Sequence, residues 1–139
     1  MATYVVDASV AVKWALNEPD SDQARRLTAH SLIAPPLLAI ECANVVGRLC
    51  QTGALTAAEA EAALAIILSP KLIWRSPDIA DVLRLAIAIG CPAYDCAYLV
   101  LAEAAGVPLV TADQRLLAKA AGVERLKGRV VALGEVAEH

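Results

Sequence analysis

The sequence has no long uninterrupted apolar segment. Although 58% of its residues are hydrophobic, no run approaches the roughly 18 residues that a membrane-spanning helix needs. The N-terminus also lacks the charged start, apolar stretch and cleavage site of a secretory signal. We therefore expect a protein that has no membrane segment and stays in the cytoplasm.

The cysteines and histidines lack the spacing of a zinc site. Neither CxxC nor HxxxH occurs among the 4 cysteines and 2 histidines, so a structural zinc site and a thiol redox motif have no support. We expect the cysteines to be small buried hydrophobic residues. A disulfide between Cys91 and Cys96 stays open, because intracellular disulfides are less rare in hyperthermophiles.

Basic residues are not in excess. The chain has 12 Lys and Arg against 15 Asp and Glu, which gives a net charge of -3. Proteins that coat nucleic acid through bulk electrostatics usually carry a basic surplus. Any contact with nucleic acid is therefore expected to be local.

The 139 residues fit one compact domain, which we expect to span 1–139. Short apolar runs predict strands, and apolar residues at helical spacing between cap residues predict helices. The expected strands are 3–7, 32–34, 72–74, 107–111 and 129–132. The expected helices are 9–15, 20–30, 37–50, 56–68, 78–90, 95–105 and 113–121.

The alternation of strands and helices predicts the fold class. The strands are short, apolar on both faces and separated by helices, which is typical of a parallel sheet covered on both sides. We therefore expect a three-layer α/β/α sandwich. In such sheets, ligand sites lie outside the carboxyl ends of the strands.

Acidic residues stand at the positions where such a site forms. Asp7 closes the first strand, Asp113 follows the fourth, and Ser9 and Thr111 flank them as hydroxyl donors. The two carboxylates face the same crevice if these strands are neighbours. Each aspartate can also be read as a helix cap, a role that Asp fills well.

Glu41 and Asp95 lie in apolar helical runs. A carboxylate among Leu38, Ile40 and Val45 is costly to bury unless a partner compensates for its charge. A metal ion is one such partner, and an ion pair with Arg48 or Arg84 is another.

Asn44 and Asp95 can each be read in more than one way. Asn44, three residues after Glu41, is placed to orient Glu41 or to contact a substrate. Asp95 can also be read as a cap of its helix.

Four converging carboxylates would repel one another without a cation. Oxygen ligands favour Mg²⁺ or Mn²⁺ over zinc or copper. Such ions activate water and neutralise phosphate charge, so phosphodiester hydrolysis is the chemistry that this set indicates. Asp7, Glu41, Asp95 and Asp113 are therefore the expected catalytic metal ligands.

The motifs Val5-Val6-Asp7-Ala8-Ser9, Glu41 with Asn44, Tyr94-Asp95 and Thr111-Ala112-Asp113 resemble, in order and approximate spacing, those of PIN-domain ribonucleases. The resemblance covers the whole chain and looks closest to VapC-type toxins of toxin-antitoxin pairs. It implies a sheet of order 3-2-1-4-5 and an endoribonuclease that depends on Mg²⁺ or Mn²⁺. It also implies a homodimer and inhibition by a cognate antitoxin protein. On this sequence, Asp7, Glu41, Asp95 and Asp113 become the metal ligands, supported by Ser9, Thr111 and Asn44.

Lys13, Arg115 and Lys119 lie near the expected strand ends and are candidate contacts to RNA phosphates. Exposed basic side chains on helices are more often simply solvated. In the helical hairpin 37–68, alanines exceed what one core face requires, which indicates either helix propensity or a dimer or antitoxin surface. The members of this set are Ala57, Ala60, Ala63 and Ala65.

Other functions remain to be weighed against a toxin nuclease. PIN domains also occur as RNA-processing nucleases and as non-catalytic binding modules. A phosphatase or receiver domain with a nucleophilic aspartate needs paired acids near the first strand, which Asp7-Ala8-Ser9 does not offer. Neither GxGxxG nor GxxxxGK[ST] occurs, so nucleotide-cofactor binding has no support.

Overall fold

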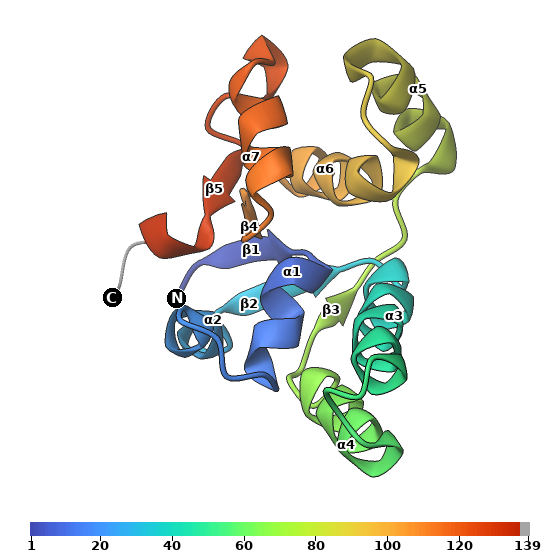
Figure 1. The fold of residues 1–139 in the computed structure, drawn as a ribbon. Helices are drawn as coiled ribbons and strands as arrows, with labels where there is room; N and C mark the ends of the chain where they lie inside the picture. Colours follow the sequence, from blue (N-terminus) through green and yellow to red (C-terminus); the bar gives the residue numbers. More distant parts are fainter. Residues whose placement is uncertain (137–139) are drawn as a thin grey trace.

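A parallel five-stranded sheet forms the centre of the protein (Figure 1). The structure is a computed structural model, and it describes residues 1–136. The strand order is β3-β2-β1-β4-β5, and every neighbouring pair is parallel. Both the fold class and the strand order confirm the prediction from sequence. The strands are β1 (Thr3–Val6), β2 (Ser31–Ala34), β3 (Ile73–Trp74), β4 (Leu109–Thr111) and β5 (Val130–Ala132).

Helices flank the sheet and complete an α/β/α arrangement. In Figure 1, α5, α6 and α7 lie above β1, α1 crosses the view of the strands, α2 and α3 lie on either side of β2 and β3, and α4 lies at the bottom. The α-helices are α1 (Ala8–Ala11), α2 (Ser21–Leu27), α3 (Leu37–Gln51), α4 (Ala57–Ile67), α5 (Ile79–Ile89), α6 (Ala93–Ala105) and α7 (Gln114–Ala121). Short 3₁₀ turns are η1 (Val12–Trp14), η2 (Glu124–Leu126) and η3 (Leu133–Glu135).

The core extends through the sheet and includes the contact between the sheet and α6. Val5, Val6, Leu109 and Val110 in the two central strands are fully buried. Helix α6 packs against β1, β2 and β4 and buries seven consecutive residues, 96–102, as expected of a helix that is apolar all round. Since each large apolar side chain contributes roughly 1.5–3 kcal/mol when buried, this contact fixes the sheet against α6.

Several element boundaries differ from the prediction. The first helix is only α1 and continues as the 3₁₀ turn η1, and α2 ends at Leu27 instead of about His30. Asp20 precedes α2 without capping it through its side chain, because its carboxylate pairs with Lys13 at 2.8 Å. β3 is a two-residue edge strand whose side chains are exposed, so it is not apolar-buried on both faces.

The structure describes the chain as far as residue 136. Residues 137–139, which belong to the expected domain and include His139, lie outside the described residues. Within residues 1–136, no single helix is long and apolar enough to cross a membrane, and α5 and α6 reach that length and composition only as a pair bent by 112°.

Candidate active site

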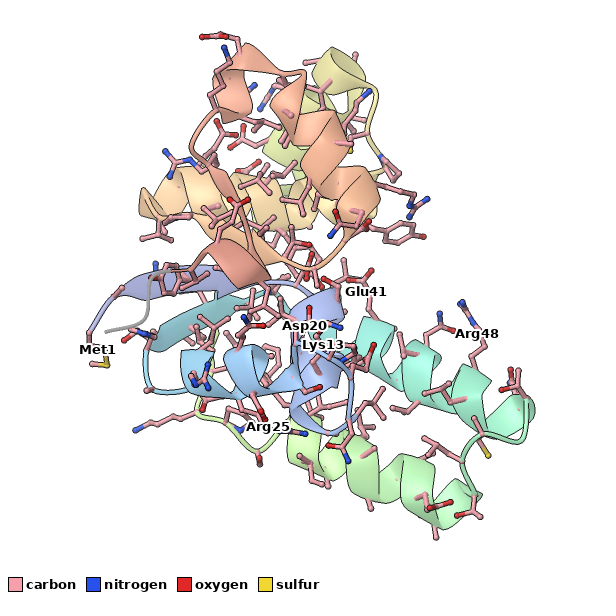
Figure 2. All side chains as sticks on the ribbon, turned by 60° about the vertical axis from the view of Figure 1, so that its left-hand side comes forward. Met1, Lys13, Asp20, Arg25, Glu41 and Arg48 are labelled. Carbon is pink, nitrogen blue, oxygen red and sulfur yellow. The ribbon has the colours of Figure 1, made fainter. Side chains whose placement is uncertain are left out.

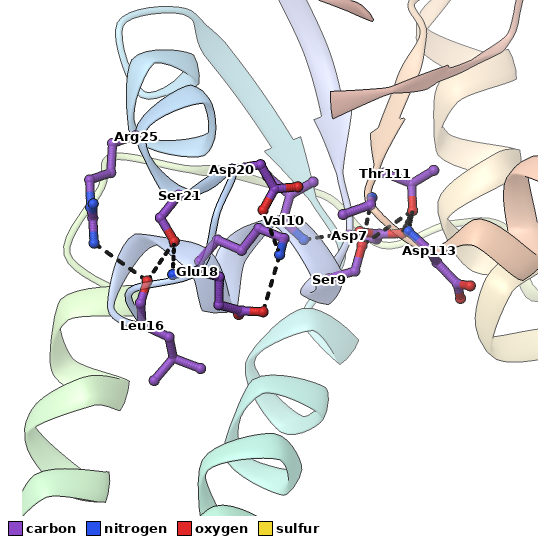
Figure 3. Close-up of polar contacts among 12 residues, drawn as sticks. Asp7, Ser9, Val10, Leu16, Glu18, Asp20, Ser21, Arg25, Thr111 and Asp113 are labelled. Carbon is purple, nitrogen blue, oxygen red and sulfur yellow. Dashed lines mark hydrogen bonds and ion pairs between the residues drawn. The ribbon is translucent and has the colours of Figure 1, made fainter. Parts of the chain in front are cut away.

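The carboxyl ends of β1 and β4 bring Asp7 close to Asp113 (Figure 3). The two strands are adjacent, and Val6 pairs with Val110. Asp7 therefore stands beside Thr111 at the sheet edge, with Asp113 two residues further along the chain. The crevice that parallel sheets use for ligands lies at this edge.

Asp7 is held by two hydroxyl groups. Ser9 Oγ donates to Asp7 Oδ1 at 2.5 Å, and Thr111 Oγ1 donates to Asp7 Oδ2 at 2.5 Å. The backbone N–H of Val10 also donates to Oδ1, at 3.3 Å. The pKa of Asp7 is raised to about 6 as a net result: burial raises it most, the three hydrogen bonds lower it, and the charge of Asp113 raises it.

The backbone after β4 fixes the direction of these hydroxyl groups. The N–H of Ala112 donates to Ser9 Oγ at 2.9 Å, and the N–H of Asp113 donates to Thr111 Oγ1 at 3.0 Å. Because the oxygens already accept these bonds, their hydrogens are available to Asp7. Ser9 and Thr111 thus support Asp7 from both sides.

The two aspartates also cap helices, as the alternative interpretation expected. Asp7 caps α1 through Val10, and Asp113 caps α7 by accepting from the N–H groups of Arg115 at 2.9 Å and Leu116 at 3.3 Å. Both of those bonds end on Oδ1 of Asp113, so Oδ2 accepts no hydrogen bond within residues 1–136. Capping and a role at the sheet edge are therefore compatible.

Glu41 has a partner that the sequence analysis missed. It lies in the second turn of α3, which begins just after β2 ends, and Figure 2 shows it near the junction of α3 with the upper helices. The hydroxyl of Tyr98 in α6 donates to Glu41 Oε1. The pairing considered with Arg84 is wrong, since Arg84 binds Asp81 at 2.8 Å. Arg48 is exposed and makes no ion pair with Glu41 in the described part of the chain.

Tyr98 could have been found only from its position relative to Asp95. It follows Asp95 by three residues, which places both on one side of α6. Its contact with Glu41 joins residues 57 positions apart, so periodicity gives no sign of it. Burial raises the pKa of Glu41, the Tyr98 hydrogen bond lowers it, and the charge of Asp95 raises it.

Asp95 lies in the first turn of α6 and is half-buried. The interpretation of Asp95 as a cap is wrong, because α6 begins at Ala93 and Pro92 occupies the cap position. An acid in the first turn interacts favourably with the helix dipole. Burial raises the pKa of Asp95, the charge of Asp113 raises it further, and the charge of Arg115 lowers it.

The four acids therefore form a continuous electrostatic series. Asp113 acts on Asp7 and on Asp95, and Asp95 acts on Glu41, each raising the pKa of its neighbour. As the side chains stand in residues 1–136, no three acids, histidines or cysteines are grouped closely enough to hold a metal ion. Mg²⁺ is usually held by one or two carboxylates together with water and substrate phosphates, so the oxygen donors present fit an ion bound between pairs.

The remaining candidate residues differ in their surroundings. Asn44 is exposed and makes no side-chain hydrogen bond within the described chain. Lys13 is largely covered and bound by Asp20 and Glu18, at 2.8 and 3.3 Å, so its charge is already matched. The side chain of Arg115 is 92% exposed and lies 3.9 Å from Asp113, where it is free to reach outward.

Lys119 lies in α7, near Cys91, which precedes α6. The Lys119 ammonium lies near Gly90. Burial raises the pKa of Cys91, and the charge of Lys119 lowers it. Cys91 and Cys96 are free thiols, as are Cys42 and Cys50.

A depression of about 500 Å³ adjoins the acidic edge. Ser9 and Ala112 line both the depression and the surroundings of Asp7. Its walls are otherwise mainly apolar, with one lysine and one glutamate: Val12, Lys13, Leu16, Glu18, Val45 and Leu49.

The fold resembles that of known proteins. The structure is similar to the crystal structure of PAE2754 from Pyrobaculum aerophilum, with a TM-score of 0.75 and 26% sequence identity over 96% of this chain and 90% of that one. It also matches a PilT N-terminus domain protein, SSO1118 from Sulfolobus solfataricus, with a TM-score of 0.44 and 12% identity over 100% of this chain and 98% of that one. No curated protein matches the chain.

A family model assigns the fold. The model of the PIN domain matches residues 4–123, a range that contains β2, β3, β4, all of β1 except Thr3, and the four acids of the candidate site. PIN domains are typically nucleases and generally use divalent metal ions. This chain belongs to the PIN-domain family.

Proposed function

We propose that this protein is an endoribonuclease that depends on Mg²⁺ or Mn²⁺ and serves as the toxin of a type II toxin-antitoxin pair. The observation that carries the proposal is the carboxylate of Asp7, which is buried at the sheet edge beside Asp113. Burial makes its charged form costly, and its pKa is raised to about 6. A carboxylate in that position, next to a second acid, is a strong site for a cation. The proposed metal ligands are Asp7, Glu41, Asp95 and Asp113.

The side chains have separate tasks in this proposal. The chemistry that a divalent ion supplies in such a site is activation of water and neutralisation of phosphate charge. Ser9 and Thr111 keep Asp7 in one orientation by hydrogen bonds to both of its oxygens. Asp113 Oδ1 accepts the two hydrogen bonds that cap α7, and Oδ2 accepts none in the described chain, which leaves it available to a metal ion.

RNA is the proposed substrate, and the contacts to it are local. Arg115 is the best placed of the three basic candidates, because its guanidinium is exposed and close to Asp113. Lys119 is a weaker candidate beside Gly90. Lys13 has two carboxylate partners and is expected to shape the adjoining depression instead of binding phosphate.

The partners are proposed as well. A single PIN domain of this kind acts in the cytoplasm as a homodimer, inhibited by a cognate antitoxin whose tail enters the groove at the acidic edge. The apolar depression beside Ser9 and Ala112 supports such an entry, because it offers a hydrophobic wall next to the acids. Support for a dimer comes from exposed apolar residues on α5, among them Ile79, Leu83 and Ile87.

The test of the proposed function is RNA cleavage by the purified, antitoxin-free protein. End-labelled structured RNAs are incubated with Mg²⁺ or Mn²⁺, beside a control with EDTA. We expect metal-dependent cleavage by the wild type and a loss of roughly a hundredfold or more in Asp7→Asn and Asp113→Asn, because each change removes ligand charge at nearly constant size.

Asp22→Asn is the matched control, because Asp22 is exposed on α2 and, within residues 1–136, pairs only with Arg25. It should cleave like the wild type. A fully active Asp113→Asn protein would remove that residue from the site. Absence of cleavage by the wild type, together with absence of Mn²⁺ binding, would favour a non-catalytic binding module over a nuclease.

A further inference from the structure

Tyr98 connects the two helices that carry Glu41 and Asp95. Its hydroxyl donates to Glu41 Oε1, and its side chain is 2% exposed. Within residues 1–136, Glu41 makes no other side-chain hydrogen bond, so Oε2 is its one oxygen without a partner. The carboxylate is thus held at one oxygen and open at the other.

The phenol is not free to move away from Glu41. Tyr98 lies inside the buried stretch of α6 and is among the largest fully buried side chains. A hydrogen bond from a neutral donor to a carboxylate is stronger than one between neutral groups. Rotation of Glu41 about its side chain therefore requires breaking this bond.

We propose that Tyr98 is a positioning residue that makes Glu41 a ligand through one oxygen and thereby selects Mg²⁺ or Mn²⁺ against Ca²⁺. This inference rests on the proposed function, since it concerns the cation of the same site. Mg²⁺ demands near-octahedral geometry and is bound through one or two carboxylates. Ca²⁺ accepts more oxygens, and carboxylates often bind it through both.

The neighbours of Glu41 do not provide this restraint. Asp95 repels Glu41 and is not a donor to it. Asn44, one turn further along α3, is exposed and makes no side-chain hydrogen bond in the described chain. Removal of the Tyr98 hydroxyl consequently frees Glu41 to offer both oxygens.

The experiment compares the affinities for Mg²⁺, Mn²⁺ and Ca²⁺ alone, without RNA, in the wild type, Tyr98→Phe and Tyr4→Phe. Isothermal titration measures each dissociation constant. Tyr4→Phe is the control, because Tyr4 is half-buried against His30 and its hydroxyl makes no hydrogen bond in residues 1–136. We expect the preference for Mg²⁺ over Ca²⁺ to fall about tenfold in Tyr98→Phe only, which corresponds to loss of one hydrogen bond to a charged group.

A second measurement covers the case in which Tyr98→Phe does not fold. Binding of Mg²⁺ to the wild type should perturb the near-ultraviolet absorption of a buried tyrosine, and the same perturbation should persist in Tyr4→Phe. An unchanged preference in a folded Tyr98→Phe, or no perturbation in the wild type, would overturn the role of Tyr98 and leave the nuclease proposal standing. A wild type that binds none of the three ions would overturn both.

Discussion

Asp7 carries an electrostatic cost that the fold does not fully offset. Its side chain is buried, and three hydrogen bonds stabilise its charged form without cancelling the effect of burial on its pKa. A group whose pKa is raised on folding stabilises the native state most when it is protonated. That contribution is complete below the unfolded pKa of 3.8 and is lost as the pH rises through about 6.

We therefore predict that Asp7→Asn makes the metal-free protein more stable at pH 8. The shift in pKa corresponds to about 3 kcal/mol at most. An asparagine retains the carbonyl acceptor for Ser9 and Val10, so a gain of roughly 1–2 kcal/mol is expected at pH 8 and little at pH 4. Urea unfolding in EDTA at both values measures it.

Asp22→Asn, which changes an exposed acid, should show no such gain at either pH. A lower stability of Asp7→Asn at pH 8 would mean that the hydroxyl contacts matter more than desolvation. The cost of ionising Asp7 would then be too small to drive cation binding.

At the scale of elements, residues close together in the sequence were sufficient to predict where most helices begin and end, whereas contacts between distant residues could not be predicted. The helices expected at 56–68 and 78–90 begin with local caps, a capping box of Thr56 and Glu59 in α4 and the side chain of Asp78 in α5. Gly90 and Gly106 end α5 and α6 in the left-handed conformation, where glycine has no steric cost. Such features depend only on residues within one turn.

What could not be predicted depends on partners distant in sequence. Asp20 has the residue type of a cap, yet the ammonium of Lys13 binds its carboxylate. Glu41 was correctly singled out as a costly acid in an apolar helix, but its partner is Tyr98 and not an arginine. Asp7 and Asp113 were singled out because strand ends meet at one edge, and Glu41 and Asp95 because acids are costly in apolar helices. The partner of Glu41, in contrast, depends on how α3 and α6 pack.

The capping box gives a prediction for α4. Thr56 Oγ1 accepts from the Glu59 N–H at 3.1 Å, and Glu59 Oε1 accepts from the Thr56 N–H at 2.9 Å. Thr56→Ala should lower the free energy of unfolding by about 1 kcal/mol. Chemical denaturation measures this loss, and Thr52→Ala is the control, since the hydroxyl of Thr52 bonds only to a carbonyl in its own helix. Equal losses in the two variants would show that the box adds nothing.

At the scale of the whole molecule, large exposed apolar side chains lie on α5 as well as in the hairpin of α3 and α4, where the sequence suggested an interface as one alternative. In the hairpin of α3 and α4, Ala60 and Ala63 are buried, and only Ala57 and Ala65 of the four alanines are exposed. The hairpin also exposes Ile40 and Ile66, at 70 and 49%. On α5 the exposed apolar side chains have a spacing of four residues, which puts them on one stripe. Ile79, Leu83 and Ile87 are 73, 60 and 75% exposed.

The position of α5 makes this stripe accessible to another chain. Helix α5 packs chiefly against α6, and Figure 1 shows it at the margin of the molecule. Three large apolar residues in a row on one helix form a contiguous patch of the kind that marks protein interfaces. The proposed homodimer is therefore expected to use α5 instead of the alanines of α4.

Leu83→Glu and Ala65→Glu distinguish the two surfaces. A charge in the middle of the α5 stripe would be buried without a partner in a dimer formed there, so Leu83→Glu should shift the protein from dimer to monomer. Ala65→Glu places the same charge on the exposed side of α4 and should leave the dimer intact. Light scattering coupled to gel filtration measures the mass of each variant at equal concentration. A monomeric Ala65→Glu beside a dimeric Leu83→Glu would move the interface to the hairpin, and a monomeric wild type would leave the α5 stripe to a different partner.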